Sequence, residues 1–179
     1  MSALSFLIIS AVNIYLFILL LRVWMQAVGA DFYNPGAQFI VKVTQPIVAP
    51  FRRLLPFVKN IDIASLVVAY LVALIKVVVL FKAHSSLIML WFAFLTLLKS
   101  FGFLIFWLLI IRAIMSWFSR GQSALDQQLY QLTEPLMAPI RRVIPTFAGL
   151  DFSAMIVVFL LYFLNRLAFD LFGIIWVYL

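Results

Sequence analysis

The chain has 179 residues, of which 67% are hydrophobic, and its mean hydropathy is +1.20. A soluble domain contains roughly 45–50% apolar residues, so its interior could not cover this much apolar surface. The composition therefore predicts an integral membrane protein whose remaining apolar surface faces lipid. Cysteine is absent, which excludes disulfides, thiolate metal sites and cysteine nucleophiles. The net charge of +7 gathers beside apolar runs, which is typical of cytoplasmic, lipid-facing charge and argues against nucleic-acid binding.

The first apolar segment, residues 3–28, is predicted to be a retained membrane-spanning helix. Residues 3–21 carry no charge and match the roughly 20 residues that a bilayer requires. Arg22 follows the apolar run, whereas a cleaved signal peptide has its basic region before that run. Asn13 is the one amide inside the segment, and we expect it to hydrogen-bond to another helix rather than to a ligand.

Residues 29–61 are predicted to form the first membrane-proximal segment. Asn34-Pro35 is a favourable helix start, because asparagine caps a helix and proline presets φ. Apolar residues on one face and polar residues on another predict a short amphipathic helix lying in the membrane interface. Its prolines are expected to break the helix, and the basic turn that follows contains Pro46, Pro50, Arg52 and Arg53.

Residues 62–81 are predicted to form the second span, with Asp62 as a helix cap or as an ion-pair partner of arginine. Residues 87–118 are too long for one simple crossing, and Lys99-Ser100 divides them. Either a stretch in the outer interface precedes a shorter span, or one long helix is tilted. Alignment of the two halves of the sequence favours a span over about residues 93–118.

Residues 119–150 are predicted to form a second membrane-proximal segment. Ser123-Ala-Leu-Asp126 resembles a capping box, and leucines at helical spacing predict a second interfacial amphipathic helix. The second basic turn is expected to contain Pro135, Pro139, Arg141 and Arg142. The last span, residues 151–175, begins at Asp151, again a helix cap or ion-pair partner. It is followed by Trp176 and Tyr178, residue types typical of the membrane interface.

One motif occurs twice in the chain. Thr44-Gln-Pro-Ile-Val-Ala-Pro-Phe-Arg-Arg-Leu-Leu-Pro56 returns 89 residues later as Thr133-Glu-Pro-Leu-Met-Ala-Pro-Ile-Arg-Arg-Val-Ile-Pro145. Six of the seven prolines match, and Arg22 with Met25 matches Arg112 with Met115, one residue out of register. This pattern indicates a tandem duplication, with one unit over residues 1–86 and the other over residues 87–179.

The duplication predicts the architecture and the topology. Each unit contains a span, an interfacial helix, a basic proline turn and a second span, so four spans are expected. Two spans return the chain to its starting side, so the units are expected to be parallel, related by a pseudo-twofold axis along the membrane normal. Nine of the 13 basic residues lie in or beside the two long loops. The positive-inside bias therefore places the loops in the cytoplasm and both termini outside.

The residues from Asp31 to Arg53, together with the run from Ile61 to Tyr70, resemble the bacterial YggT family of small integral membrane proteins. The resemblance covers essentially the whole chain, and the doubled Pro-x-x-x-Pro-x-Arg-Arg motif carries it. The family includes YlmG proteins, which are encoded near cell-division genes, and plastid relatives linked to thylakoid cytochrome assembly. The resemblance implies a bacterial inner-membrane factor that acts through partners in envelope or complex assembly. An osmotic or potassium-related role has also been proposed for bacterial members.

No catalytic residue, metal site or cofactor is predicted. His84 is the one histidine, and the sequence contains no glycine-rich phosphate loop and no nucleophile motif. A non-enzymatic scaffold or assembly factor is therefore the favoured function, and a small transporter or channel is the alternative. Four charged residues in the outer half of the membrane could reach the headgroups or line a polar cavity: Lys76, Lys99, Arg166 and Asp170. A basic lining would repel cations, which disfavours a potassium channel.

The two arginine pairs are the strongest candidates for a binding site. Anchoring at anionic headgroups is worth about 1 kcal/mol per basic residue. Guanidinium groups also suit the carboxylates or phosphates of a docked partner, either another membrane protein or a second copy of the chain. The matched prolines are expected to fix the backbone that presents the arginines. The predicted contact set is Arg52, Arg53, Arg141 and Arg142 with Pro46, Pro50, Pro135 and Pro139.

Overall fold

The computed structural model describes residues 3–55, 61–81, 87–118, 123–144 and 152–179. In chain order the helices are α1 (Ala3–Ala27), α2 (Pro35–Arg52), α3 (Ile63–Phe81), α4 (Leu87–Phe118), α5 (Ala124–Val143), α6 (Ser153–Phe172) and α7 (Ile174–Tyr178). Four residues that the sequence analysis singled out lie outside the described ranges: Pro56, His84, Pro145 and Asp151.

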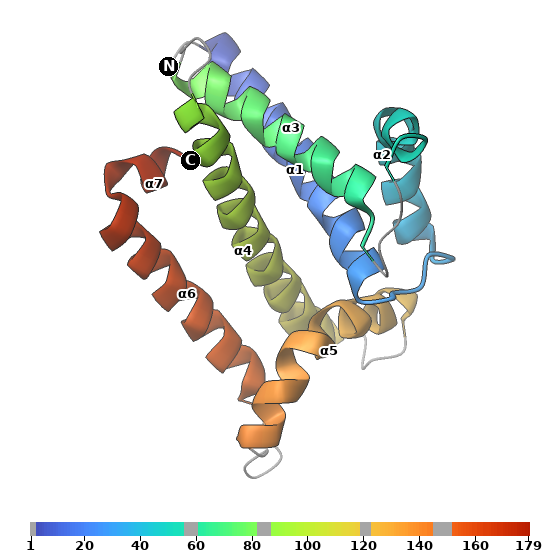
Figure 1. Ribbon diagram of the computed structural model, residues 1–179. Coiled ribbons are helices and arrows are strands. Elements are labelled where there is room, and N and C mark those ends of the chain that lie inside the picture. Colours follow the sequence, from blue (N-terminus) through green and yellow to red (C-terminus); the bar gives the residue numbers. More distant parts are fainter. Residues whose placement is uncertain (1–2, 56–60, 82–86, 119–122, 145–151) are drawn as a thin grey trace.

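Four of these helices, α1, α3, α4 and α6, are long and apolar enough to cross a membrane. Their lengths run from 19 to 32 residues, or roughly 28 to 48 Å at the α-helical rise of about 1.5 Å per residue. The prediction of an all-helical membrane protein with four candidate spans is confirmed at this level. Both termini lie at one end of the bundle, here called the terminal end, and the opposite end is called the loop end (Figure 1).

The core of the bundle lies where α1, α3 and α4 meet. α1 and α3 pack side by side and antiparallel, and α4 packs against both (Figure 1). Leu16 and Leu19 of α1 are fully buried, and so are Ala69 and Ala73 of α3. Small residues such as these alanines let helix backbones approach closely, which is how membrane helices gain van der Waals contact. In contrast, α6 diverges from α4 towards the terminal end, and little of its surface is buried (Figure 1).

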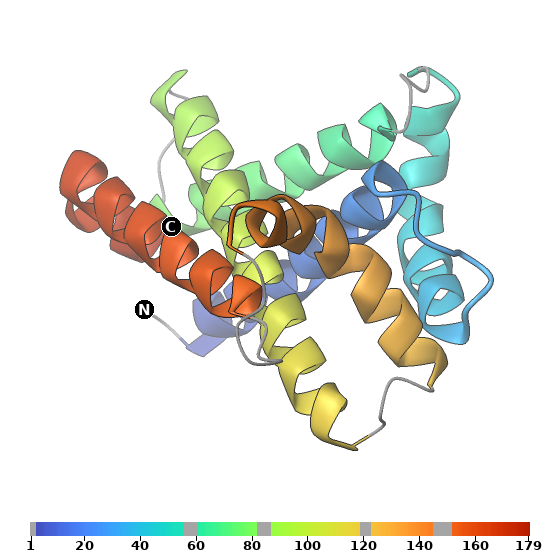
Figure 2. The same cartoon turned by 90° about the horizontal axis from the view of Figure 1, so that it is seen from below.

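The shorter helices α2 and α5 lie at the loop end and begin as their sequences predict (Figure 2). Asn34 caps α2 by accepting a hydrogen bond from the Gly36 amide at 3.0 Å, and Pro35 occupies the first helical position. At the start of α5, Ser123 and Asp126 form a reciprocal capping box. Both predicted helix starts are therefore confirmed.

The prediction that the matched prolines break these helices is wrong. α2 continues through Pro46 and Pro50 as far as Arg52, and α5 continues through its two prolines, Pro135 and Pro139, as far as Val143. All four proline side chains are exposed, on faces away from the buried residues of their helices. A proline removes one helical hydrogen bond and leaves a carbonyl without its donor. On an exposed face that carbonyl can be solvated, which lowers the cost of the proline. Packing of the opposite face then stabilises the helix enough for it to continue.

The expected division of residues 87–118 at Lys99-Ser100 is also absent. α4 is one helix of 32 residues that begins at Leu87, because lysine and serine are tolerated inside helices and neither removes a backbone donor. Its length matches the alternative of one long helix, whereas the favoured span over about residues 93–118 begins too late for the observed helix.

The last apolar segment forms two helices instead of one span over residues 151–175. Gly173 has φ 62° and ψ −144°, and this backbone reversal ends α6 and starts α7. Only 5% of the surface of Trp176 is exposed. Its indole stacks on Phe172 and donates to the Asn165 side chain at 2.9 Å. The turn at Gly173 thus folds this indole back onto α6.

The backbone at Gly173 generates a testable prediction. Its dihedral angles are accessible essentially to glycine alone, so Gly173→Ala should destabilise the protein by about 1–3 kcal/mol and release α7. Gly102 is the matched control: it lies inside α4, and a Cβ there meets no atom within 4 Å. Gly102→Ala should be neutral or stabilise by about 0.5–1 kcal/mol. Thermal melting of both variants in detergent measures the difference, and equal melting temperatures would contradict the strain at Gly173.

Candidate functional site

A buried arginine joins three helices near the loop end. Arg22, in the last turns of α1, is only 2% exposed. Its guanidinium donates to the Thr44 hydroxyl and, at 2.8 Å, to the Gln45 side-chain oxygen, both on α2. Its Nε lies 3.8 Å from an Asp62 carboxylate oxygen at the start of α3. A buried charge is tolerated only when it is paired and hydrogen-bonded, so these groups fix how α1, α2 and α3 meet.

Thr44 links this arginine to the backbone of α2. It is fully buried, and its hydroxyl donates to the Ile40 carbonyl at 2.7 Å while accepting from Arg22. A hydroxyl has one donor and can accept as well, so a single threonine satisfies both neighbours. This arrangement holds the Arg22 side chain against one face of α2, opposite the exposed prolines.

Asp62 is the acidic centre of the same cluster. Its carboxylate is 1% exposed and accepts from the Ser65 hydroxyl at 2.7 Å and from the Ser65 amide at 3.3 Å, a contact typical of a helix cap. Arg52 binds the same carboxylate through two guanidinium nitrogens. Burial alone would raise the pKa of Asp62, but the hydrogen bonds from Arg52 and Ser65 outweigh it and hold the pKa below its ordinary value. The carboxylate is therefore ionised at neutral pH.

A second cluster of similar composition joins α4 to α5. Arg112 donates to the Thr133 hydroxyl, which in turn donates to the Leu129 carbonyl at 2.7 Å. Glu134 occupies the position that Gln45 has in the first cluster. It lies 3.8 Å from Arg112 and accepts from Arg141 at 2.6 Å. These two groups are called here the first arginine network (Arg22, Thr44, Gln45, Arg52, Asp62, Ser65) and the second arginine network (Arg112, Thr133, Glu134, Arg141).

The two members of each arginine pair have different environments. Arg52 and Arg141 point into the networks and bind carboxylates. Arg53 and Arg142 are exposed, and within the described ranges neither has an ion pair or a side-chain hydrogen bond. Each is followed by an exposed aliphatic residue: Leu54 is 82% exposed and Val143 is 80% exposed. The predicted set of four equivalent arginines therefore separates into two network residues and two outward-facing ones.

The other predicted site residues fall outside the networks. The four prolines (Pro46, Pro50, Pro135 and Pro139) lie on the exposed faces of α2 and α5. Asp151 lies outside the described residues. In the part of the chain that the structure describes, no group of three or more histidine, cysteine, aspartate or glutamate side chains could hold a metal ion.

Sequence analysis missed most of the network partners. Arg22, Arg112, Thr44 and Thr133 were matched between the two halves of the sequence, but they were not proposed as a site. The signal was available, because a polar residue kept at matching positions of two apolar segments indicates a shared structural role. Gln45 with Glu134 was harder to find, since one position carries an amide and the other an acid.

Four helices that are long and apolar enough to cross a membrane, three of them held by polar networks at the loop end, are typical of a multi-span helical membrane protein. The sequence model of the CCB3/YggT family matches this chain twice, over residues 1–82 and over residues 91–172. The chain therefore belongs to the CCB3/YggT family.

The curated relatives span nearly the same length as this chain. The Escherichia coli K12 protein named "Uncharacterized protein YggT" is 52% identical over 166 residues, covering 92% of this chain and 88% of the relative. A Vibrio alginolyticus protein named "Uncharacterized protein in proC 3'region" is 46% identical, covering 98% of each chain. A Haemophilus influenzae "Uncharacterized protein" is 41% identical over 94% of this chain and 92% of its own length. No solved structure matches the chain.

The first arginine network yields a stability prediction. Asp62→Asn removes the buried carboxylate that compensates Arg52 and Arg22, and breaking a buried pair in this way should destabilise by about 3 kcal/mol. Asp170→Asn is the control, because the Arg166–Asp170 pair is exposed and such pairs contribute about 0–1 kcal/mol. Unfolding by denaturing detergent, followed by circular dichroism, compares the two variants.

The same variant tests the lowered pKa of Asp62. A carboxylate with a lowered folded-state pKa contributes its full stability above the unfolded value, about 3.9, and loses it as pH falls through the folded-state value. The stability gap between wild type and Asp62→Asn should therefore persist down to about pH 4 and close only below it. A gap that closes above about pH 5 would contradict the ionised, hydrogen-bonded carboxylate.

Proposed function

We propose that this protein is a non-enzymatic scaffold or assembly factor of the bacterial inner membrane, acting in envelope, division or membrane-complex biogenesis. The observation that carries the proposal is that the two arginines of each pair have different environments. One arginine of each pair is held by a carboxylate, and its neighbour is left exposed at the end of the same helix. A folded network that orients an outward guanidinium favours a binding surface over a catalytic centre.

The exposed pairs Arg53-Leu54 and Arg142-Val143 have the chemistry of such a surface. A guanidinium binds phosphate or carboxylate through a planar fork, and the adjacent aliphatic side chain can enter an apolar environment. Both pairs lie at the C-terminal ends of their helices, where a cation is favourable. Anionic headgroups or the acidic surface of a membrane-protein partner would meet both requirements.

We further infer that the two halves are parallel repeats related by a pseudo-twofold axis, with α2 and α5 as interfacial helices. The paired contacts Arg22–Thr44 and Arg112–Thr133, together with the double family match, support this inference. The basic residues concentrate in or beside the two long loops, and basic loops face the cytoplasm under the positive-inside rule. This distribution supports a loop end in the cytoplasm and both termini on the outer side.

This topology can be tested by cysteine labelling, since the chain has no cysteine of its own. A cysteine introduced at Leu54 should resist an impermeant maleimide in intact cells and react after the membrane is permeabilised. Leu54 is suitable because its side chain is 82% exposed. A cysteine at Leu4, 68% exposed near the terminal end, should react in intact cells. The reverse pattern would invert the topology.

The binding role of the outward arginines can be separated from the structural role of the network arginines. Replacing Arg53 and Arg142 by alanine should leave protein level and melting temperature unchanged, because neither side chain holds a helix in place. The same double variant should fail to restore the envelope or osmotic phenotype of a deletion strain. The matched pair Arg52→Ala with Arg141→Ala should instead lower the protein level, because it leaves carboxylates without their partners.

Lysine substitution then distinguishes docking from anchoring. If fork geometry matters, Arg53→Lys with Arg142→Lys should accumulate normally and still fail to restore the phenotype. Full restoration by the lysine variant would reduce these residues to an electrostatic anchor and would overturn the docking proposal.

The alternative of a small cation transporter has less support. Two ammonium groups, Lys76 and Lys99, line a cavity between α1, α3, α4, α6 and α7, and most of the other lining residues are apolar. A pathway with this lining would repel cations and offers them few oxygen ligands.

A further inference from the structure

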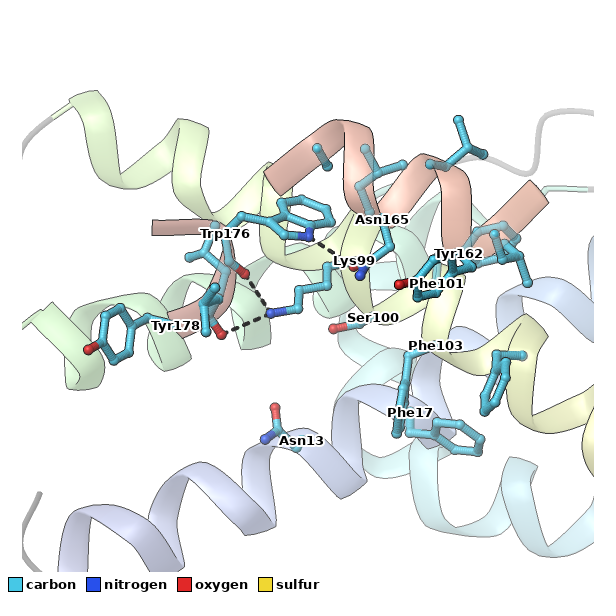
Figure 3. Close-up of a pocket in the computed structure, with 18 of the residues that line it drawn as sticks. Asn13, Phe17, Lys99, Ser100, Phe101, Phe103, Tyr162, Asn165, Trp176 and Tyr178 are labelled. Atoms are coloured by element: carbon cyan, nitrogen blue, oxygen red, sulfur yellow. Dashed lines mark hydrogen bonds between the residues drawn. The ribbon is translucent and has the colours of Figure 1, made fainter. Parts of the chain in front are cut away.

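A large cavity is lined by residues that belong to neither arginine network. Its volume is about 1380 Å³, larger than the roughly 300–1,000 Å³ of a typical small-ligand pocket. Helices α1, α3, α4, α6 and α7 all contribute to its walls, so it lies between the two halves of the chain. Apolar residues, both aliphatic and aromatic, make up most of the lining. Phe17, Phe101, Phe103 and Tyr162 are among the aromatic ones (Figure 3).

Two lysines form the charged part of this cavity. Lys99 of α4 donates to the carbonyls of Trp176 and Val177 at 2.6 and 3.1 Å, and Lys76 of α3 donates to the Leu179 carbonyl. These lysines thereby cap the last carbonyls of α7. Of the two alternatives for Lys76, lining a cavity fits better than reaching the headgroups, because its side chain is 6% exposed and bonds inside the protein. In the described ranges neither lysine pairs with an aspartate or glutamate side chain.

The depth of the lysines follows from helix geometry. Lys99 precedes Arg112 by 13 residues and Lys76 follows Asp62 by 14 residues, which is about 20 Å along each helix axis. The arginine networks and the lysines are therefore separated by most of a hydrocarbon core of about 30 Å. The lysines lie in the half of the bilayer that is nearer to the terminal end, where two cations without an aspartate or glutamate partner among the described residues favour an anionic ligand.

Uncharged polar groups lie on the same side of the cavity as the lysines. Figure 3 shows Ser100 and Asn165 close to Lys99, with Asn13 facing them from α1 across the opening. Asn165 accepts from Trp176, whereas Asn13 has no hydrogen-bond partner in the described part of the chain. The expected contact of Asn13 with another helix is therefore absent, and its amide is available to a ligand. The cavity thus has a polar, cationic side and an aromatic side, which together match an amphiphile.

We propose that this cavity binds an anionic membrane phospholipid. Its phosphate lies near Lys99, Ser100 and Asn13, and its acyl chain lies along the aromatic wall between α4 and α6. A free inorganic anion would make no contact with most of the apolar lining. A zwitterionic lipid would place the positive group of its own headgroup near the lysines, which would repel it. The site is independent of the outward arginines, so it stands or falls separately from the proposed scaffold role.

Native mass spectrometry of the purified full-length chain tests this site. The protein carries Arg53→Ala and Arg142→Ala, so that headgroup binding at the loop end does not contribute. It is equilibrated with equal amounts of phosphatidylglycerol and phosphatidylcholine, and the retained lipids are counted. We expect phosphatidylglycerol to be preferred, and Lys99→Gln to reduce the preference about fivefold, as loss of about 1 kcal/mol per basic residue implies.

Lys99→Gln also removes the hydrogen bonds from Lys99 to α7, so two further variants test the cavity without changing either lysine. Gly102 lines the cavity, and a Cβ there meets open space, so Gly102→Leu should fill the site and lower retention of lipid. Asn13→Leu should weaken the anionic preference without touching either lysine. Arg166→Gln is the control, because this exposed basic residue of α6 lies outside the lining and should change nothing.

Each remaining outcome contradicts the proposal. Equal retention of the two lipids, or retention that Gly102→Leu leaves unchanged, would show that the bound lipid lies elsewhere. Displacement of the lipid by millimolar inorganic phosphate would instead identify a site for a free anion. Melting temperatures of all variants are measured in parallel. If Lys99→Gln unfolds, the lipid retention of Gly102→Leu and Asn13→Leu decides whether the lipid binds in this cavity.

Discussion

The structure depends on the burial of Arg22. A guanidinium that is 2% exposed inside a helical bundle is stable only if every neighbouring helix supplies an acceptor or a counter-charge. Thr44 and Gln45 of α2 and Asp62 at the start of α3 provide these groups. The position of α2 is thus determined by satisfying one charge. The second network repeats the contacts, but not the full burial, with Arg112, Thr133 and Glu134; the side chains of Arg112 and Glu134 are 23% and 24% exposed.

This constraint explains why two adjacent arginines have different roles. On a helix, neighbouring side chains point about 100° apart, so one can enter the bundle while the next faces outward. Arg52 and Arg141 take the inward position and satisfy carboxylates, and their successors Arg53 and Arg142 remain available. The inward arginines are less able to bind an external ligand. Any other anion would have to compete with the carboxylate that already pairs with each of them.

Sequence reasoning recovered the four candidate spans, the helix starts at Asn34 and Ser123 and the family, because these rest on local composition and capping chemistry. It placed helix ends wrongly at the prolines, since the exposed face that tolerates them is a property of tertiary packing. It also could not foresee that Lys76 and Lys99 cap α7, because that contact requires the chain reversal at Gly173. The arginine pairs were found, but their division depended on which residue faces a carboxylate.

The contacts between the two halves of the chain are asymmetric. Trp24 of α1 donates its indole N–H to the Leu132 carbonyl of α5 at 2.9 Å, and the Asp31 amide donates to the Gln131 side chain. The matching positions carry Ile114 and Lys42, which offer no side-chain donor and no acceptor respectively. Two identical single-unit chains, related by a twofold axis, would have to make every contact in both directions. With both halves in one polypeptide, donor and acceptor can differ between the halves, so a contact made at one position needs no counterpart at the matching one.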